Sequence, residues 1–262
     1  MKKAIAAVLA LSISIAPGCG GKSDERVIIA GSTSVQPYAE VLAEDYALLY
    51  PESEIDVQGG GSAAGITAAE TGAADIGMSS RALQDDETAL WSVEIARDGL
   101  AIIVNPKNSV ADLTLDQIRG LYAAEITDWS ELGGTKAKVH IIAREAGSGT
   151  RSAFEDLVMN GYEITPKAIV QDSNGAVRQL VSSDPNSIGF ISLGLVDQTV
   201  KAIKLEGVTA SRDNVLNESY SLYRPFLFVA KSEPEGLAAN FIEFVLSPEG
   251  KEILSNEGLI PY

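Results

Sequence analysis

Short apolar runs alternate with longer amphipathic stretches along most of the chain. The apolar runs have the length and the Ile, Val and Ala content of buried strands, and they cover residues 27–30, 100–104, 139–143 and 187–191. Apolar residues recur at helical spacing over residues 38–46, 113–122, 152–158, 175–183 and 237–246. Strands and helices that alternate in this way predict an α/β protein with mainly parallel sheets.

Three predicted strands end in a turn of glycine and hydroxyl residues that opens a helix. The turns are residues 31–34, 59–62 and 147–150, and they follow the strands predicted at residues 27–30, 54–58 and 139–143. The first N–H groups of a helix have no partner within it, and the macrodipole is positive there. Such helix starts bind small anions, although the hydroxyls of any single turn could simply cap the helix.

The third turn has the richest chemistry, because it lies between Arg144 and Arg151 and carries the hydroxyls of Ser148 and Thr150. Guanidinium groups and hydroxyls around a helix start form a seat for a small tetrahedral anion. The three turns together favour a binding site over three unrelated helix caps.

The formal net charge of −16 excludes one large class of partner. Nucleic-acid-binding proteins need clustered Lys and Arg, so we expect no nucleic acid here. The long-range field of such a protein repels anions, so an anion site must attract its ligand by local geometry.

The N-terminal segment has the pattern of a targeting sequence. Lys2 and Lys3 precede an apolar stretch, residues 4–15, that is too short to span a membrane. Residues 16–19, Ala-Pro-Gly-Cys, resemble a bacterial lipobox. We therefore predict a signal peptide at residues 1–18, a lipid on Cys19 and a tether over residues 19–26. The alternative is ordinary cleavage after Ala16, which would leave the chain's single cysteine as a free thiol.

The sequence shows no pattern typical of a catalytic, metal or nucleotide site. A nucleophile at Ser148 would need a base, and the one histidine, His140, lies inside a predicted buried strand, where we expect a packed imidazole. One histidine and one cysteine give no metal-ligand spacing. The turn at 59–62 lacks the lysine of a nucleotide-binding P-loop. We expect no catalytic residue, no metal and no cofactor.

Four stretches together resemble the phosphate-binding subunit of bacterial phosphate ABC transporters. They are residues 30–34, 58–62, 74–81 and 144–151, in that order along the chain. The resemblance implies a two-lobed periplasmic-binding-protein fold of type II, with two crossover strands and phosphate in the cleft between the lobes. It also implies an extracytoplasmic protein that delivers phosphate to an ABC permease. With the lipid predicted on Cys19, we expect a monomer that is anchored to the cell membrane, on its periplasmic or extracellular face.

We place lobe 1 at residues 27–104 and 220–262, and lobe 2 at residues 105–219. The first boundary is the stop at Asn105-Pro106, directly after the strand predicted at residues 100–104. The second lies near the start of the apolar stretch 220–229.

Carried over to the matching positions, the resemblance implies hydrogen-bond donors to phosphate from all three turns. These donors are Thr33, Ser34, Ser62, Ser148, Gly149 and Thr150. Arg144 would supply positive charge, and Asp75 would accept a hydrogen bond. Possible further contacts are Ser32, Ser80, Arg81 and Arg151; for Arg81, a surface salt bridge is as good an interpretation.

Asp75 is the predicted specificity element. Phosphate near neutral pH retains a P–OH proton that a carboxylate can accept, whereas sulfate offers only lone pairs, and facing acceptors are costly when buried. The alternative for Asp75 is a solvent-facing or capping acid.

Two departures from the family pattern affect the surroundings of the site. Ala63 stands where glycine is common, and Ala146 stands where many members have an acid that supports the arginine. Adjacent strand residues point to opposite faces, so we expect Glu145 to be a poor partner for Arg144. The functional alternatives are a receptor for another oxyanion such as sulfate or molybdate, a sensor that presents phosphate to a partner, and a secreted phosphatase-like enzyme.

Overall fold

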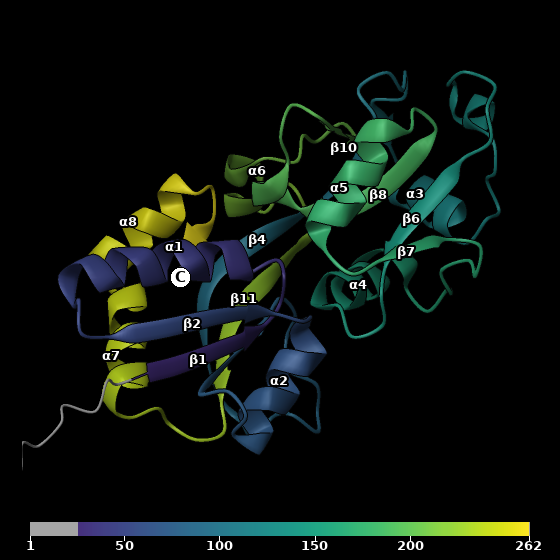
Figure 1. Cartoon of the computed structure of the whole chain (residues 1–262). Coiled ribbons are helices and arrows are strands. Elements are labelled where there is room, and N and C mark those ends of the chain that lie inside the picture. The colour runs from purple at the N-terminus through teal and green to yellow at the C-terminus, as the bar shows by residue number, and fades with distance from the viewer. Residues whose placement is uncertain (1–25, 262) are drawn as a thin grey trace, which may run out of the picture.

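Two lobes share a pair of long strands in the computed structural model, which describes residues 26–261 (Figure 1). The strands are β4 (Trp91–Val104) and β11 (Tyr223–Ala230), and they pair antiparallel from Trp91 opposite Ala230 to Gly99 opposite Tyr223. The predicted α/β class with two crossover strands is confirmed. Parallel pairing holds for most of the other strands, whereas the crossover strands run antiparallel to their neighbours.

Lobe 1 is a sheet in the order β2-β1-β3-β11-β4 with four helices. Its remaining strands are β1 (Arg26–Gly31), β2 (Glu54–Gly59), β3 (Ile76–Ser79) and the short β12 (Ile260–Pro261), which pairs with β4. The helices are α1 (Gln36–Leu49), α2 (Ser62–Thr71), α7 (Gly236–Leu246) and α8 (Pro248–Asn256). Helices α1, α7 and α8 pack together over the sheet, and α2 packs separately on β1, β3 and β11.

Lobe 2 continues the sheet in the order β4-β8-β6-β7. Its strands are β6 (His140–Arg144), β7 (Ile169–Gln171), β8 (Ser187–Ser192) and β9 (Lys201–Ala202), while β5 (Asp112–Leu113) and β10 (Lys204–Leu205) form a separate pair. The helices are α3 (Leu115–Tyr122), α4 (Gly149–Phe154), α5 (Asn174–Ser183) and α6 (Arg212–Leu216). A π-helical turn, Glu155–Met159, continues α4, and 3-10 turns cover Trp129–Leu132 and Leu193–Leu195.

The second half of β4 belongs to lobe 2, although the sequence placed residues 100–104 in lobe 1. Leu100, Ile102 and Val104 enter a core with α3 and α4, whereas Ala101 and Ile103 enter another core with α5, as the two-residue period of a strand requires. The same residues pair with β8. The boundary therefore lies near Gly99, and residues 220–222 also lie with lobe 2. Charged residues 97–98 interrupted the apolar pattern and hid the continuous strand.

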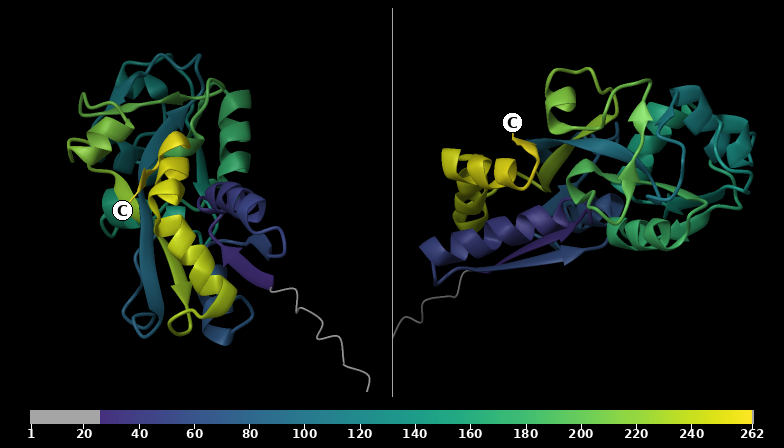
Figure 2. Two further views of the ribbon diagram at one scale, coloured as in Figure 1. Left: turned by 90° about the vertical axis from the view of Figure 1, so that its left-hand side faces the viewer. Right: turned by 90° about the horizontal axis from the view of Figure 1, so that it is seen from above.

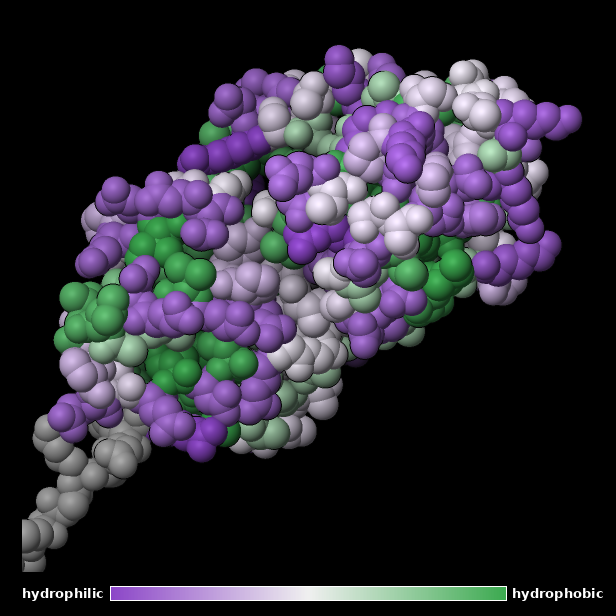
Figure 3. All heavy atoms as spheres, turned by 45° about the horizontal axis from the view of Figure 1, so that its top comes forward, coloured by the Kyte–Doolittle hydropathy of each residue, from purple (hydrophilic) through white to green (hydrophobic). Residues whose placement is uncertain are grey.

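The surface is mostly polar in the face that Figure 3 presents, with apolar groups in separate patches on both lobes. The large apolar side chains that are exposed include Leu48 and Leu49 at the end of α1, and Ile169 and Val170 in β7. Strand β1 begins at the end of lobe 1 that is remote from lobe 2 (Figures 1 and 2). Within residues 26–261, no helix combines the length and the apolar character that crossing a membrane requires.

Glycines let α2 lie directly against the sheet. A Cβ atom on Gly65 would come within 2.5 Å of the Ala30 carbonyl oxygen and 2.6 Å of the Gly31 Cα. A Cβ on Gly77 would meet the Gly65 carbonyl oxygen at 2.5 Å. This close contact sets the position of Ser62, the first residue of α2, beside the ends of β1 and β3.

We expect Gly65→Ala to lower the free energy of unfolding by about 1–3 kcal/mol, because the added methyl group has backbone on all sides. Urea denaturation monitored by circular dichroism measures the change. Gly175→Ala is the matched control, since nothing lies within 4 Å of its added Cβ, and it should change stability by less than about 0.5 kcal/mol. Equal stability of the two variants would contradict the close packing of α2.

Candidate anion-binding site

The predicted turns converge where the two lobes meet. Polar side chains from the ends of β1, β3, β6 and β8, from the starts of α2, α4 and α5, and from both crossover strands are buried there together. We call them the interlobe cluster: Ser32, Ser34, Ser62, Ser80, Asp98, Arg144, Thr150, Asn174, Ser192 and Arg224, each at most 2% exposed. Buried polar groups are costly unless they are paired, so their hydrogen bonds can be accounted for one by one.

Three hydroxyls from lobe 1 contact each other. The Ser32 hydroxyl donates to Ser80 Oγ at 2.9 Å, and the Ser80 backbone N–H donates to Ser62 Oγ at 3.0 Å. The oxygens of Ser62 and Ser80 lie 3.3 Å apart. Two of the predicted turns and the end of β3 are thus brought to one point.

The start of α4 lies against these hydroxyls from the lobe 2 side. A Cβ on Gly149 would come within 2.2 Å of Ser62 Oγ and 2.6 Å of Ser80 Oγ, so only glycine fits there. Ser148 caps the helix, because its Oγ accepts the Arg151 N–H at 3.2 Å. The N–H groups of the first turn, at Gly149 and Thr150, have no partner within the helix.

Ser34 connects both lobes, and its hydrogen bonds determine which way its proton points. Its Oγ accepts from Asn174 Nδ2 at 2.9 Å and from Arg224 Nη2 at 3.1 Å, which occupies both lone pairs. Its single proton is therefore donated to Thr150 Oγ1, 2.8 Å away. The Thr150 proton is then left to donate elsewhere. Of these two predicted donors, Thr150 therefore keeps a hydroxyl proton for an anion, whereas the Ser34 proton is already used.

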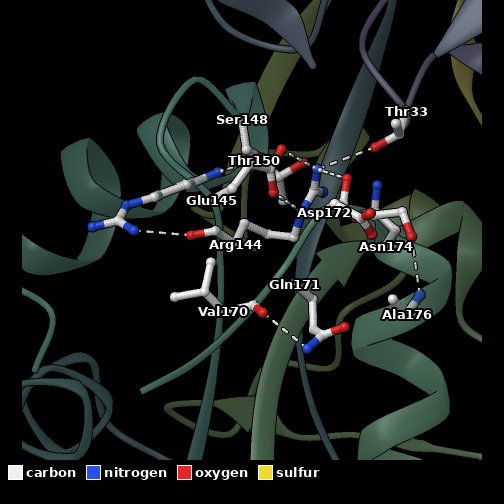
Figure 4. A network of polar contacts seen from close by, with 12 residues as sticks. Thr33, Arg144, Glu145, Ser148, Thr150, Val170, Gln171, Asp172, Asn174 and Ala176 are labelled. Atoms are coloured by element: carbon white, nitrogen blue, oxygen red, sulfur yellow. Dashed lines mark hydrogen bonds and ion pairs between the residues drawn. The ribbon is translucent and has the colours of Figure 1, made fainter. Parts of the chain in front are cut away.

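Arg144 is 1% exposed and is held by both lobes (Figure 4). Its Nε and Nη2 donate to Glu145 Oε2 at 2.9 Å and Oε1 at 3.0 Å. Nη2 also donates to Thr33 Oγ1 in lobe 1 and to the Asp172 carbonyl oxygen, each at 3.1 Å. The expectation that Glu145 is a poor partner is wrong, because β6 ends at Arg144 and the alternation of faces ends with it. Glu145 supports the arginine in place of an acid at Ala146.

Asp98, Asn174, Ser192 and Arg224 are cluster residues that sequence reasoning missed. Arg224 on β11 stands directly opposite Asp98 on β4 and donates to its Oδ2 from Nε at 3.2 Å and from Nη2 at 3.0 Å. The Ser192 hydroxyl donates to Asp98 Oδ1 at 2.8 Å. The sequence did contain a signal for this pair, because Asp98 and Arg224 are each a charged residue within a largely apolar strand.

Two guanidinium groups in the cluster have an unused nitrogen. Among the described residues, Arg144 Nη1 and Arg224 Nη1 are buried without a hydrogen-bond partner, as is the hydroxyl of Tyr38. Burial lowers the pKa of the Arg224 guanidinium, Asp98 opposes that effect, and the positive charge of Arg144 lowers the pKa further. Two cations that repel each other in a buried setting are stabilised by an anion between them.

Asp75 does not belong to the cluster, and its predicted role as phosphate acceptor is wrong. It is exposed, and its Oδ2 accepts the Ile28 N–H at 2.8 Å. Asp75 precedes β3, whereas Ser80 follows it, and five extended residues separate them by about 16 Å. The strand has its two ends on different sides of lobe 1, so proximity in sequence did not mean proximity in space.

The two outer arginines have other partners. Arg81 donates to Glu87 Oε2 at 2.6 Å, Glu87 Oε1 at 2.7 Å and the Ala82 carbonyl oxygen at 2.8 Å. Arg81 therefore forms the salt bridge that the sequence analysis gave as its alternative role, but the pair is largely buried and does not lie on the surface. Arg151 donates to Glu155 Oε1 at 2.8 Å and to the Arg144 carbonyl oxygen at 2.9 Å, so it supports the backbone of Arg144.

The cluster offers donors rather than metal ligands. Two carboxylates lie at the cluster, and each is hydrogen-bonded to an arginine: Asp98 to Arg224 and Glu145 to Arg144. Within residues 26–261, no group of three or more His, Cys, Asp and Glu side chains could hold a metal ion. Guanidinium, hydroxyl and backbone N–H donors around one point suit a small oxyanion.

The chain matches one family model and several curated phosphate-binding proteins. Residues 20–249 match the family model of the PBP superfamily domain. The phosphate-binding protein PstS of Bacillus subtilis (strain 168) is 31% identical over 246 residues, which covers 92% of this chain and 82% of that protein.

Solved structures give the same result. A putative phosphate ABC transporter substrate-binding protein from Clostridium perfringens, solved with bound phosphate, has a TM-score of 0.88 and 43% identity over 91% of this chain and 100% of that one. An ABC-type phosphate transport receptor from Vibrio cholerae has a TM-score of 0.76 and 40% identity over 89% of this chain and 99% of that one.

We expect Thr150→Val to weaken the binding of inorganic phosphate by about tenfold to a hundredfold, because a hydrogen bond to a charged group contributes about 1.5–3 kcal/mol. Isothermal titration calorimetry measures the affinity. Thr71→Val is the control, since the Thr71 hydroxyl only donates to the Thr67 and Ala68 carbonyl oxygens on the exposed end of α2. Equal affinities for both variants would contradict the assignment of the free donor to Thr150.

Proposed function

Because the chain belongs to the PBP superfamily and, within it, to the phosphate-binding proteins of bacterial phosphate ABC transporters, we propose that it captures inorganic phosphate outside the cytoplasm and delivers it to an ABC permease. The observation that carries the proposal is the Arg144 guanidinium, buried between the lobes with its Nη1 unpaired. Buried positive charge without a full set of acceptors favours an oxyanion ligand.

Phosphate binds in the interlobe cluster. Lobe 1 provides the hydroxyls of Ser62 and Ser80, and lobe 2 provides Arg144, the Thr150 hydroxyl and the N–H groups at Gly149 and Thr150. Thr33 supports this set by accepting from Arg144 Nη2, which leaves its own proton available. Ser62 lies at the start of α2, and Gly149 and Thr150 lie at the start of α4, where the macrodipole adds positive potential.

Binding closes the lobes on the ligand. Hydrogen bonds already join the lobes around the cluster, among them Ala63 N to the Gly147 carbonyl oxygen at 3.1 Å, Ser34 to Thr150 at 2.8 Å, Asn174 to Ser34 at 2.9 Å, and Arg144 to Thr33 at 3.1 Å. An oxyanion that bonds to both helix starts adds to the same set of contacts. The crossover strands β4 and β11 are the connections about which the lobes move.

The arrangement does not suit a hydrolase. Ser148 Oγ accepts from the Arg151 N–H, and the one histidine of the chain, His140, has its Nδ1 2.6 Å from Asp184 Oδ2 at the opposite end of β6. The predicted packed imidazole is instead part-exposed and paired. A serine nucleophile needs a base within hydrogen-bond reach. Phosphate is therefore the ligand rather than the product of an ester cleavage.

The mature chain is held at the cell membrane by a lipid on Cys19. That residue lies outside the described residues, so the support is the sequence: basic Lys2 and Lys3, an apolar stretch and a lipobox-like Ala-Pro-Gly-Cys. The described chain begins at the end of lobe 1 remote from lobe 2 (Figure 1).

We expect the mature protein to bind one phosphate per chain in isothermal titration calorimetry, and Arg144→Met to weaken binding at least a hundredfold, since it removes a buried cation from the ligand. Asp75→Asn is the matched control and should leave the affinity within twofold, because an amide oxygen can still accept the Ile28 N–H. Absence of phosphate binding by the wild-type protein would refute the function.

We expect Cys19→Ala to move the full-length protein from the detergent phase to the aqueous phase in a detergent partition assay after expression in a bacterial host, because the lipid is lost. The phosphate affinity should not change. If the unaltered protein also partitions into the aqueous phase, ordinary signal cleavage is the better interpretation.

A further inference from the structure

The Asp98–Arg224 pair sits on the two crossover strands that connect the lobes, β4 and β11 (Figure 1). Its side chains are 1% and 2% exposed. A surface ion pair would contribute little to stability, and a buried one must offset a large desolvation cost. The pair is not needed to join the strands, since the backbone ladder of β4 and β11 extends on both sides of it.

The donors of Arg224 are almost all assigned. Nε donates to Asp98, and Nη2 donates to Asp98 and to Ser34 Oγ, which uses three of its five N–H groups. The remaining two, both on Nη1, are buried and have no partner. Arg144 has the same pattern: Nε and Nη2 are bonded, and Nη1 is not.

The two guanidinium groups are linked by their charge and by a chain of hydrogen bonds. Each lies within range of the other's charge. Ser34 accepts from Arg224 and donates to Thr150, and Thr150 belongs to the same helix start that follows Arg144. Each cation also has its own carboxylate on the far side: Glu145 for Arg144 and Asp98 for Arg224. A carboxylate that binds Nε and Nη2 fixes the guanidinium plane and leaves Nη1 directed away from it.

We propose that Arg224 is a second phosphate-binding cation, held in place by Asp98, and that its Nη1 donates to the same phosphate as Arg144 Nη1. This assignment rests on the proposed function and adds a contact from the crossover strands to those from the two lobes. Phosphate is then held by lobe 1, lobe 2 and the connection between them. Arg224 also acts on the ligand through Ser34. By donating to Ser34 Oγ, it helps to fill the lone pairs of that oxygen, so that the Ser34 proton is donated to Thr150.

The competing partner for Arg224 Nη1 is an aromatic ring. The Arg224 Cζ lies 5.5 Å from the centre of the Phe226 ring, which is within range of a cation–π contact. That contact would account for a buried guanidinium without a ligand. A crystal structure of the phosphate complex separates the two, since Nη1 must lie within hydrogen-bond distance of a phosphate oxygen if Arg224 binds the ligand. Nη1 over Phe226 with no contact to phosphate would overturn the proposal.

Calorimetry gives the energetic test. Removing Arg224 alone would leave Asp98 buried and unpaired, so the informative variant is the neutral pair Asp98→Asn with Arg224→Gln. We expect it to weaken phosphate binding by about tenfold to a hundredfold, the value of a charge-assisted hydrogen bond. Arg224→Lys keeps the charge but loses the planar fork, and we expect it to lie between the wild type and the neutral pair.

The control is a second buried arginine–carboxylate pair in lobe 1. Arg81 and Glu87 have side chains 8% and 16% exposed, and the guanidinium bonds only to groups outside the cluster. Arg81→Gln with Glu87→Gln should keep the phosphate affinity within twofold, even where thermal unfolding without ligand shows a similar loss of stability. An equal affinity loss for both pairs, or none for the Arg224 pair, overturns the proposal, whereas a wild-type protein that binds no phosphate refutes the function itself.

Discussion

Burial of like charge at the lobe boundary is the constraint on which the rest of the structure depends. Arg144 and Arg224 are almost inaccessible to solvent and lie close enough to repel each other. Each is held by a carboxylate, and each retains an unpaired nitrogen. The carboxylates reduce the cost of burying the cations. Under the proposed function, phosphate completes this compensation, and the lobes are most stable together when they share it.

The fold meets this constraint by bringing the ends of several strands and the starts of several helices together. Parallel strands that lead into helices place their turns at one edge of a sheet, which is where α/β proteins bind ligands. Close packing at Gly65 brings Ser62 beside Ser80, and the absence of a side chain at Gly149 lets the opposite helix approach both hydroxyls. Glycine is needed at these positions for the space it leaves. The oxygens of Ser62 and Ser80 each already accept a hydrogen bond, so what these hydroxyls offer to a ligand is a proton to donate.

The wrong expectations for Asp75 and for Glu145 have a common cause. Asp75 lies near Ser79 and Ser80 in sequence but at the other end of their strand, where it binds the Ile28 N–H. Glu145 was discounted because strand alternation was extended one residue too far. Motif position locates a stretch of chain, whereas the end of the strand decides the direction in which each side chain points.

The sequence by itself determined the α/β class, the three glycine- and hydroxyl-bearing turns and the arginine beside the third, because strand and helix periodicity and turn chemistry are local properties. It did not determine where the chain crosses between lobes, since charged residues within β4 concealed a continuous strand. Only the tertiary structure paired Asp98 with Arg224, which are 126 positions apart. Their contact depends on the register of two antiparallel strands, and no local pattern encodes that register.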